Sequence, residues 1–206
     1  MAVTSAAFWD RVAPSYSKQA IADGESYARK LAATQALLEP GMRMLELGCG
    51  TGSTALEHAL YVEHIEATDL SAEMIAIGRE KARAAGIHNV TFRQTSIEAF
   101  EEAHQYDVVL ALNLIHLLPN RAEDLAKIHR LLKSGGLFIS STVCLADRMW
   151  YLRPVIPIMQ WLGKAPYVEF LRAESVRSEI SDAGFDIQEQ WTHGRANSLF
   201  LIARKH

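Results

Sequence analysis

Short apolar runs alternate with helical segments along most of the chain, and this alternation constrains the fold more than any other feature. Five runs have the pattern of buried strands: residues 43–47, 63–68, 90–94, 106–112 and 137–143. Helical segments are expected at 26–38, 53–61, 72–85 and 121–132. The run at 106–112 is apolar almost throughout, as is typical of a strand covered by helices on both faces. Repeated strand–helix units of this kind predict a parallel sheet.

The last part of the chain breaks this alternation. A helix near 174–183 is followed by strands at 185–192 and 198–204, and the short link between them contains Gly194 and Asn197. Two strands joined in this way predict a hairpin, which would make one edge of the sheet antiparallel. The chain's 206 residues fit one domain. We therefore expect a three-layer α/β/α sandwich with a seven-stranded mixed sheet and an antiparallel C-terminal edge strand.

A glycine-rich loop separates the first strand from the helix that follows it. Residues 46–52 read Glu-Leu-Gly-Cys-Gly-Thr-Gly. Glycines let the backbone turn tightly and approach a ligand, and the helix N-terminus offers free N–H donors. Asp69 directly follows the second strand, where a carboxylate can accept both hydroxyl protons of a ribose. The glycine loop and Asp69 together predict a nucleotide site at the carboxyl ends of the strands.

This loop and four later segments resemble the class I S-adenosylmethionine (SAM)-dependent methyltransferases. The similar segments are residues 46–52, 68–75, 106–110, 113–118 and 131–137, and the likeness runs from about Phe8 to the end. It is weakest between residues 145 and 173. The resemblance implies a Rossmann-like fold, SAM as cofactor, S-adenosylhomocysteine (SAH) as product and a small-molecule methyl acceptor. It also implies a helical lid at about 1–40 and a substrate cap inserted at about 145–172, within one domain spanning 1–206.

The resemblance also implies which residues bind the cofactor. Asp69 would hold the ribose and Tyr16 would close over the methionyl carboxylate or the substrate. Many family members carry an acid beside the adenine, where this chain has Thr95 and Ser96; a hydroxyl or backbone contact is expected there, with a solvated loop as the alternative. The full expected set is Tyr16, Glu46, Gly48, Cys49, Gly50, Gly52, Asp69, Leu70, Met74, Thr95, Ser96 and Asn113.

Two rival functions stay open at this point. An NAD-dependent oxidoreductase loop would place its third glycine three residues after the second, whereas Gly52 falls two after Gly50. A non-catalytic SAM-binding or partner-binding module is harder to separate. Methyl transfer is an in-line displacement that relies on positioning, so it leaves no diagnostic catalytic residue.

A phenol or a protonated amine must lose a proton, which makes a nearby base useful. His116, in the loop after the fourth strand, is the candidate base; the alternative is a histidine packed under the lip of the sheet. His193 is expected on the surface.

Residues 149–167 are rich in apolar and aromatic side chains and would suit a lipophilic or aromatic acceptor. Packing on the core and a dimer contact remain alternatives. A membrane surface ranks below these, because no long Lys/Arg-rich face accompanies the aromatics.

Charge and composition exclude several partners. Lys and Arg number 21 against 24 Asp and Glu, a net charge of -3, which argues against a nucleic-acid surface. No apolar run reaches the length of a membrane span, and the first ten residues lack the order of a signal peptide. Cys49 and Cys144 have no metal-like spacing. We expect a cytoplasmic monomer or homodimer without a metal or integral membrane association.

Overall fold

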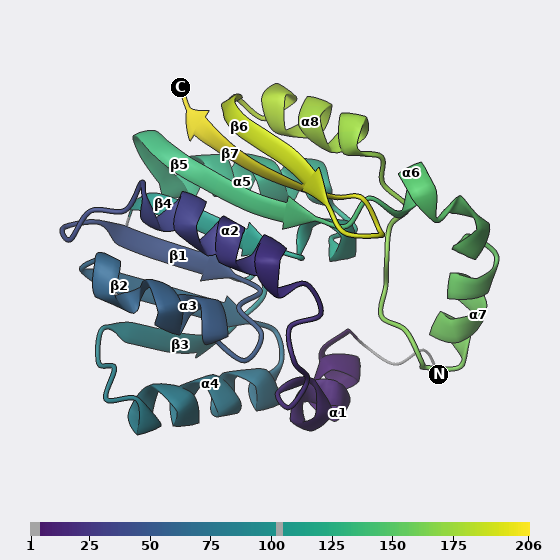
Figure 1. The fold of residues 1–206 in the computed structure, drawn as a ribbon, viewed down its shortest axis with the longest axis horizontal. Helices are drawn as coiled ribbons and strands as arrows, with labels where there is room; N and C mark the ends of the chain where they lie inside the picture. Colours follow the sequence, from purple (N-terminus) through teal and green to yellow (C-terminus); the bar gives the residue numbers. More distant parts are fainter. Residues whose placement is uncertain (1–4, 102–104) are drawn as a thin grey trace.

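The computed structural model describes residues 5–101 and 105–206, so the first four residues of the expected lid lie outside the described residues. One seven-stranded sheet organises the fold (Figure 1), in the order β3-β2-β1-β4-β5-β7-β6. Its strands are β1 (Arg43–Leu47), β2 (His64–Asp69), β3 (Val90–Gln94), β4 (Tyr106–Leu112), β5 (Leu132–Thr142), β6 (Phe185–His193) and β7 (Ser198–Lys205). The first five are parallel to one another, and β7 runs antiparallel to β5 and β6. The predicted mixed sheet with an antiparallel C-terminal strand is confirmed; β7 lies between β5 and β6.

Helices cover both faces of the sheet. The helical elements are α1 (Ser5–Tyr16), α2 (Gly24–Gln35), α3 (Ser53–His58), η1 (Ala59–Tyr61), α4 (Ala72–Ala84), η2 (Ile115–Leu117), α5 (Arg121–Leu131), α6 (Leu145–Arg148), η3 (Trp150–Leu152), α7 (Val155–Trp161) and α8 (Ala173–Asp182). Figure 1 shows α2, α3 and α4 on one face, with α5 behind the sheet. Two buried apolar clusters match this division: one joins the sheet to α5 and α8, the other joins it to α3 and α4. The sheet is thus the middle of three layers.

Side-chain caps fix where two helices begin. Asp23 accepts a hydrogen bond from the Ser26 N–H at 3.0 Å at the start of α2. Ser71 accepts one from the Met74 N–H at 3.1 Å at the start of α4. Such caps satisfy N–H groups that have no partner inside the helix. Among the described residues, no helix is long and apolar enough to cross a membrane.

The connection between α5 and β5 differs from the sequence expectation. The sequence pattern predicts a helix at 121–132 and a strand that starts at residue 137, with the Ser-Gly-Gly sequence at 134–136 as the helix stop between them. Instead, β5 begins at Leu132, where α5 ends. Tyr106 pairs with Leu132 and Val108 pairs with Leu137, so residues 133–136 form a bulge within the strand, with Gly135 at φ 74°. The glycine sequence therefore absorbs extra residues in the strand instead of ending the helix.

Candidate functional site

The glycine loop after β1 is held in place by Asp69. Its Oδ2 accepts a hydrogen bond from the Gly50 N–H at 2.9 Å, and its Oδ1 accepts one from the Ser71 N–H at 2.9 Å. Gly48, Gly50 and Gly52 have φ of 64°, 53° and 74°, in the left-handed region that favours glycine. One carboxylate thus joins the loop after β1 to the start of α4.

The three glycines serve different needs. A Cβ at Gly52 would lie 2.4 Å from the Phe92 ring, and one at Gly48 would lie 2.8 Å from Leu114. A Cβ at Gly50 would meet only Tyr16, at 4.0 Å. Gly48 and Gly52 are therefore required by packing inside the protein, while Gly50 leaves open backbone facing Tyr16. Of the three loop glycines, Gly50 therefore leaves the most room for a ligand beside its backbone.

Glu46 is a buried carboxyl that lacks a full set of partners. Its side chain sits at 3% exposure, and Oε2 has no hydrogen-bond partner among the described residues. Burial, reinforced by the nearby charge of Asp69, raises the pKa of Glu46 to about 8. Burial also raises the pKa of the Cys49 thiol well above its ordinary value, so Cys49 is a neutral thiol. A cation bound beside Glu46 would stabilise its ionised form.

Helix α1 packs against the start of α4 through Asp10, a residue that the sequence pattern did not single out. Asp10 Oδ1 accepts hydrogen bonds from the Ser71 hydroxyl at 2.6 Å and from the Glu73 N–H at 3.2 Å. The Trp9 ring meets Tyr16 edge-on at 6.4 Å between centroids. Tyr16 is half exposed and faces Gly50, as a lid residue would. No sequence signal marked Asp10, because its partners lie about 60 residues away along the chain.

Four more of the expected cofactor residues, Leu70, Met74, Thr95 and Ser96, lie in the segments that follow β2 and β3. The Thr95 N–H donates to the Asp69 carbonyl at 2.9 Å, and the Leu70 carbonyl accepts from Gln94 Nε2 at 3.3 Å. The Ser96 hydroxyl accepts from the Ala99 N–H at 3.3 Å, so it already closes a local turn. Met74 is buried in the first turn of α4. The Thr95 and Gln94 hydrogen bonds thus hold the segment after β3 against the segment after β2.

A second group of polar atoms lies at the carboxyl ends of β4 and β5. His116, in η2, is buried, and burial lowers its pKa to about 4, so its imidazole is neutral near pH 7. Its Nδ1 and the hydroxyls of Ser141 and Thr142 are buried without a hydrogen-bond partner among the described residues. Asn113 leads into this region at φ 55°, and its N–H donates to the Ser141 carbonyl at 2.6 Å. Buried polar groups without partners are rare, which marks the region as one that a ligand can complete. Strand alternation alone did not single out these hydroxyls.

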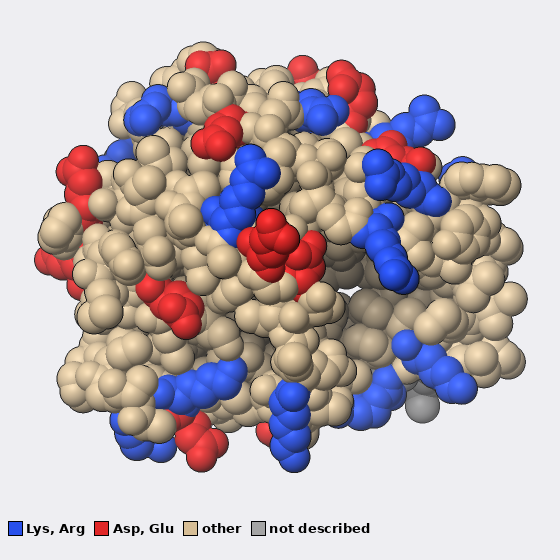
Figure 2. All heavy atoms as spheres, viewed as in Figure 1, with Lys and Arg blue, Asp and Glu red and all other residues tan. Residues whose placement is uncertain are grey.

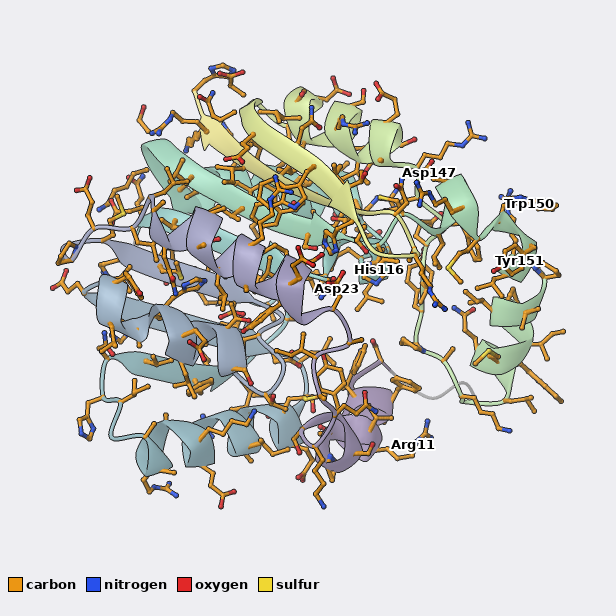
Figure 3. The ribbon with its side chains drawn as sticks, viewed as in Figure 1. Arg11, Asp23, His116, Asp147, Trp150 and Tyr151 are labelled. Atoms are coloured by element: carbon orange, nitrogen blue, oxygen red, sulfur yellow. The ribbon has the colours of Figure 1, made fainter. Side chains whose placement is uncertain are left out.

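The segment 145–172, here named the cap segment, is tied to the rest of the protein at several points, one of which is the Glu169 N–H, which donates to the His116 carbonyl at 2.8 Å. Asp147 Oδ2 accepts hydrogen bonds from the Ala173 N–H at 3.0 Å and from Asn197 Nδ2 at 2.9 Å, in the β6–β7 link. Arg11, on α1, donates to the Gly163 carbonyl. Figure 2 shows the surface hollowed between the body and this segment, and Figure 3 places Asp147 and Arg11 on opposite sides of that hollow.

His193 was expected on the surface, and this expectation is wrong. Its side chain is only 14% exposed, and its Nδ1 lies 3.9 Å from Asp23 Oδ2. The end of β6 folds against the segment before α2, which the sequence pattern of β6 could not reveal. Asp23 and His116 both lie near the centre of the molecule in Figure 3.

Comparisons with known proteins agree with this architecture. A ubiquinone biosynthesis O-methyltransferase of Acinetobacter baumannii is 30% identical over 156 residues, covering 72% of this chain and 65% of that protein. One from Marinobacter nauticus is 26% identical over 161 residues, covering 72% and 66%. The chain thus spans about two thirds of the length of these relatives.

Solved structures show the same fold. The N-methyltransferase NodS of Bradyrhizobium japonicum, in complex with SAH, superposes with a TM-score of 0.77 at 15% identity, covering 98% of this chain and 99% of that chain. The [4+2]-cyclase SpnF superposes with a TM-score of 0.69 at 17% identity, covering 87% and 80%. A family model described as "Methyltransferase domain" matches residues 38–190. That match takes in most of the chain, including the glycine loop, Asp69 and His116, and confirms the resemblance: the chain belongs to the methyltransferase domain family.

Proposed function

We propose that this protein transfers a methyl group from SAM to a small lipophilic or aromatic acceptor and releases SAH. The observation that carries the proposal is the pairing of the open Gly50 backbone with two carboxyls, the partly buried Asp69 and the buried Glu46. A nucleoside carrying a positively charged amino-acid tail complements each of these groups.

The residues present fit SAM. The Asp69 carboxylate uses one lone pair of each oxygen on a backbone N–H, which leaves acceptor capacity for two ribose hydroxyls. Glu46 offers its unpartnered Oε2 to the cationic amino-acid end. Tyr16 would cover that end across Gly50, and Leu70, Met74, Thr95 and Ser96 would border the adenine. Gly48, Cys49, Gly52 and Asn113 would shape the walls.

SAM supplies an electrophilic methyl group on a sulfonium. The protein's part is to hold the acceptor atom in line with that methyl, and alignment of this kind can lower a barrier by about 7–11 kcal/mol. We assign His116 as the base that accepts a proton from a phenolic acceptor. Its imidazole is neutral near pH 7, which is the form that accepts a proton, although a pKa of about 4 makes it a weak base. The Ser141 and Thr142 hydroxyls would orient the acceptor.

The acceptor class follows from two features. The cap segment, which borders the hollow, is rich in apolar and aromatic residues, and the curated relatives carry the name of an O-methylation in ubiquinone biosynthesis. We propose a phenolic hydroxyl on a lipophilic ring as the acceptor.

Residues 1–206 would act as one domain, with the lid at about 1–40 and the cap at 145–172 closing over the two substrates. The free cysteines Cys49 and Cys144 fit a reducing cytoplasm, and the protein would act as a monomer or homodimer.

Calorimetric titration with SAM, SAH and NAD tests the cofactor assignment. We expect saturable binding of SAM and SAH and none of NAD. Asp69→Asn should weaken SAM binding by roughly tenfold to a hundredfold, because it removes the charge from a hydrogen-bond acceptor. Asp107→Asn is the matched control: Asp107 also accepts from a backbone N–H, that of Arg43 at 2.8 Å, but at the opposite end of the sheet.

Binding of NAD alone would overturn the proposal, as would equal effects of the two aspartate substitutions. Transfer of a labelled methyl group from SAM to a panel of lipophilic phenols then tests catalysis. SAM binding without labelling of any acceptor would favour the non-catalytic module.

A further inference from the structure

The outer surface of the cap segment is apolar and exposed. None of the residues of η3 and α7 is buried. Trp161 is 83% exposed, Trp150 70% and Ile158 59%. We name the cap patch by its six members: Trp150, Tyr151, Val155, Ile158, Trp161 and Leu162. Figure 3 shows Trp150 and Tyr151 at the outer side of the segment, turned away from the sheet. Core packing therefore does not explain these side chains.

The charged residues that lie among the members of the cap patch along the chain are all positive. From residue 148 to residue 168 the chain carries Arg148, Arg153 and Lys164 and no Asp or Glu, although the whole chain has a net charge of -3. All three cations are exposed. Within the described part of the chain, none of them forms an ion pair. Arg11, which donates to Gly163, adds a fourth cation at the border of the cap segment.

We infer that the cap patch binds the surface of an anionic lipid bilayer. Tryptophan and tyrosine favour the boundary between headgroups and acyl chains, because one end of each ring is apolar and the other polar. Apolar side chains inserted at that depth gain from leaving water, and unpaired cations beside them gain from anionic headgroups. The cap patch combines both features within 17 residues, 148–164.

A second copy of the chain fits the patch less well. In a two-fold dimer through this surface, each patch would meet an identical patch. The cations of one copy would then face those of the other, with no acidic residue between 148 and 168 to compensate. An anionic bilayer complements the same charges. The inference does not depend on methyl transfer.

Co-sedimentation with vesicles tests this inference. We expect the full chain to bind vesicles of equimolar phosphatidylcholine and phosphatidylglycerol more strongly than vesicles of phosphatidylcholine alone. The double variant Trp150→Ser/Trp161→Ser should lose binding to both, by roughly tenfold per tryptophan. The double variant Arg153→Gln/Lys164→Gln should lose about twenty-five-fold on the anionic vesicles only, from roughly fivefold per cation.

Two matched controls separate the cap patch from general surface effects. Leu60→Ser removes a leucine that is 89% exposed but lies in η1, outside the patch. Arg83→Gln removes an exposed cation at the end of α4. Both should bind vesicles as the unaltered chain does, and far-UV circular dichroism should show every variant folded. Absence of binding to anionic vesicles would overturn the inference. Unchanged vesicle binding by the tryptophan variant would also overturn it. If that variant kept its vesicle binding and changed only its oligomeric state in sedimentation velocity, the patch would be a contact between copies of the chain.

Discussion

Glu46 should make the stability of the protein fall as the pH rises. In the unfolded chain its carboxyl loses its proton near the ordinary value of 4.5, whereas the folded protein keeps the proton until about pH 8. Between these values the unfolded state binds fewer protons, so the free energy of unfolding decreases with increasing pH. For one such group, the decrease from about pH 5 to about pH 8 is about 3 kcal/mol.

The variant Glu46→Gln isolates this effect, because it keeps the shape of the side chain and removes its ionisation. Urea denaturation at a series of pH values measures the free energy of unfolding of both proteins. Relative to the unaltered chain, the free energy of unfolding of Glu46→Gln should rise by about 3 kcal/mol between about pH 5 and about pH 8, the amount expected for one group.

Asp124→Asn is the matched control: burial raises the pKa of Asp124 only to about 6, so this variant should run parallel to the unaltered chain above that pH. The pKa of Asp69 is also raised by burial, but Asp69 is present in all three proteins. Curves of the unaltered chain and Glu46→Gln that stay parallel from about pH 6 to about pH 8 would refute the reasoning.

Three further outcomes are expected. Gly52→Ala should cost about 3 kcal/mol in urea denaturation, because a Cβ there would meet Phe92 at 2.4 Å at a φ of 74°. Gly86→Ala, at φ 66° with nothing within 4 Å, should cost only about 1 kcal/mol; equal costs would contradict the packing argument. His116→Asn should lower kcat for a phenolic acceptor by about a hundredfold and leave the Kd of SAM unchanged, whereas an unchanged kcat would leave His116 a packing residue. Binding of SAM near neutral pH should release up to about one proton from Glu46, seen by calorimetry in buffers of different ionisation enthalpy; equal heats would argue against a cation beside Glu46.

The sequence predicted the sheet well because its strands are short apolar runs bounded by turn residues. The ranges expected for β1, β3 and β4 match the structure residue for residue. The start of β5 was missed because a pair of glycines, here Gly135 and Gly136, can either end a helix or form a bulge in a strand, and the local sequence does not distinguish the two. His193 was misplaced because its burial depends on Asp23, some 170 residues earlier. The roles of Asp10 and of the Ser141 hydroxyl depend on contacts or unmet hydrogen bonds that only the folded chain reveals.

Helix α1 contacts both the region of the glycine loop and the cap segment. Asp10 joins this helix to Ser71, whose N–H also donates to Asp69, and Arg11 joins it to Gly163 in the cap segment. A ligand that draws Tyr16 toward Gly50 would therefore act on the same helix that contacts the cap segment. The fold alone does not dictate the reaction, since SpnF shares it and is a [4+2]-cyclase. We therefore expect the residues that select the acceptor to lie outside the glycine loop, where α1 and the cap segment meet.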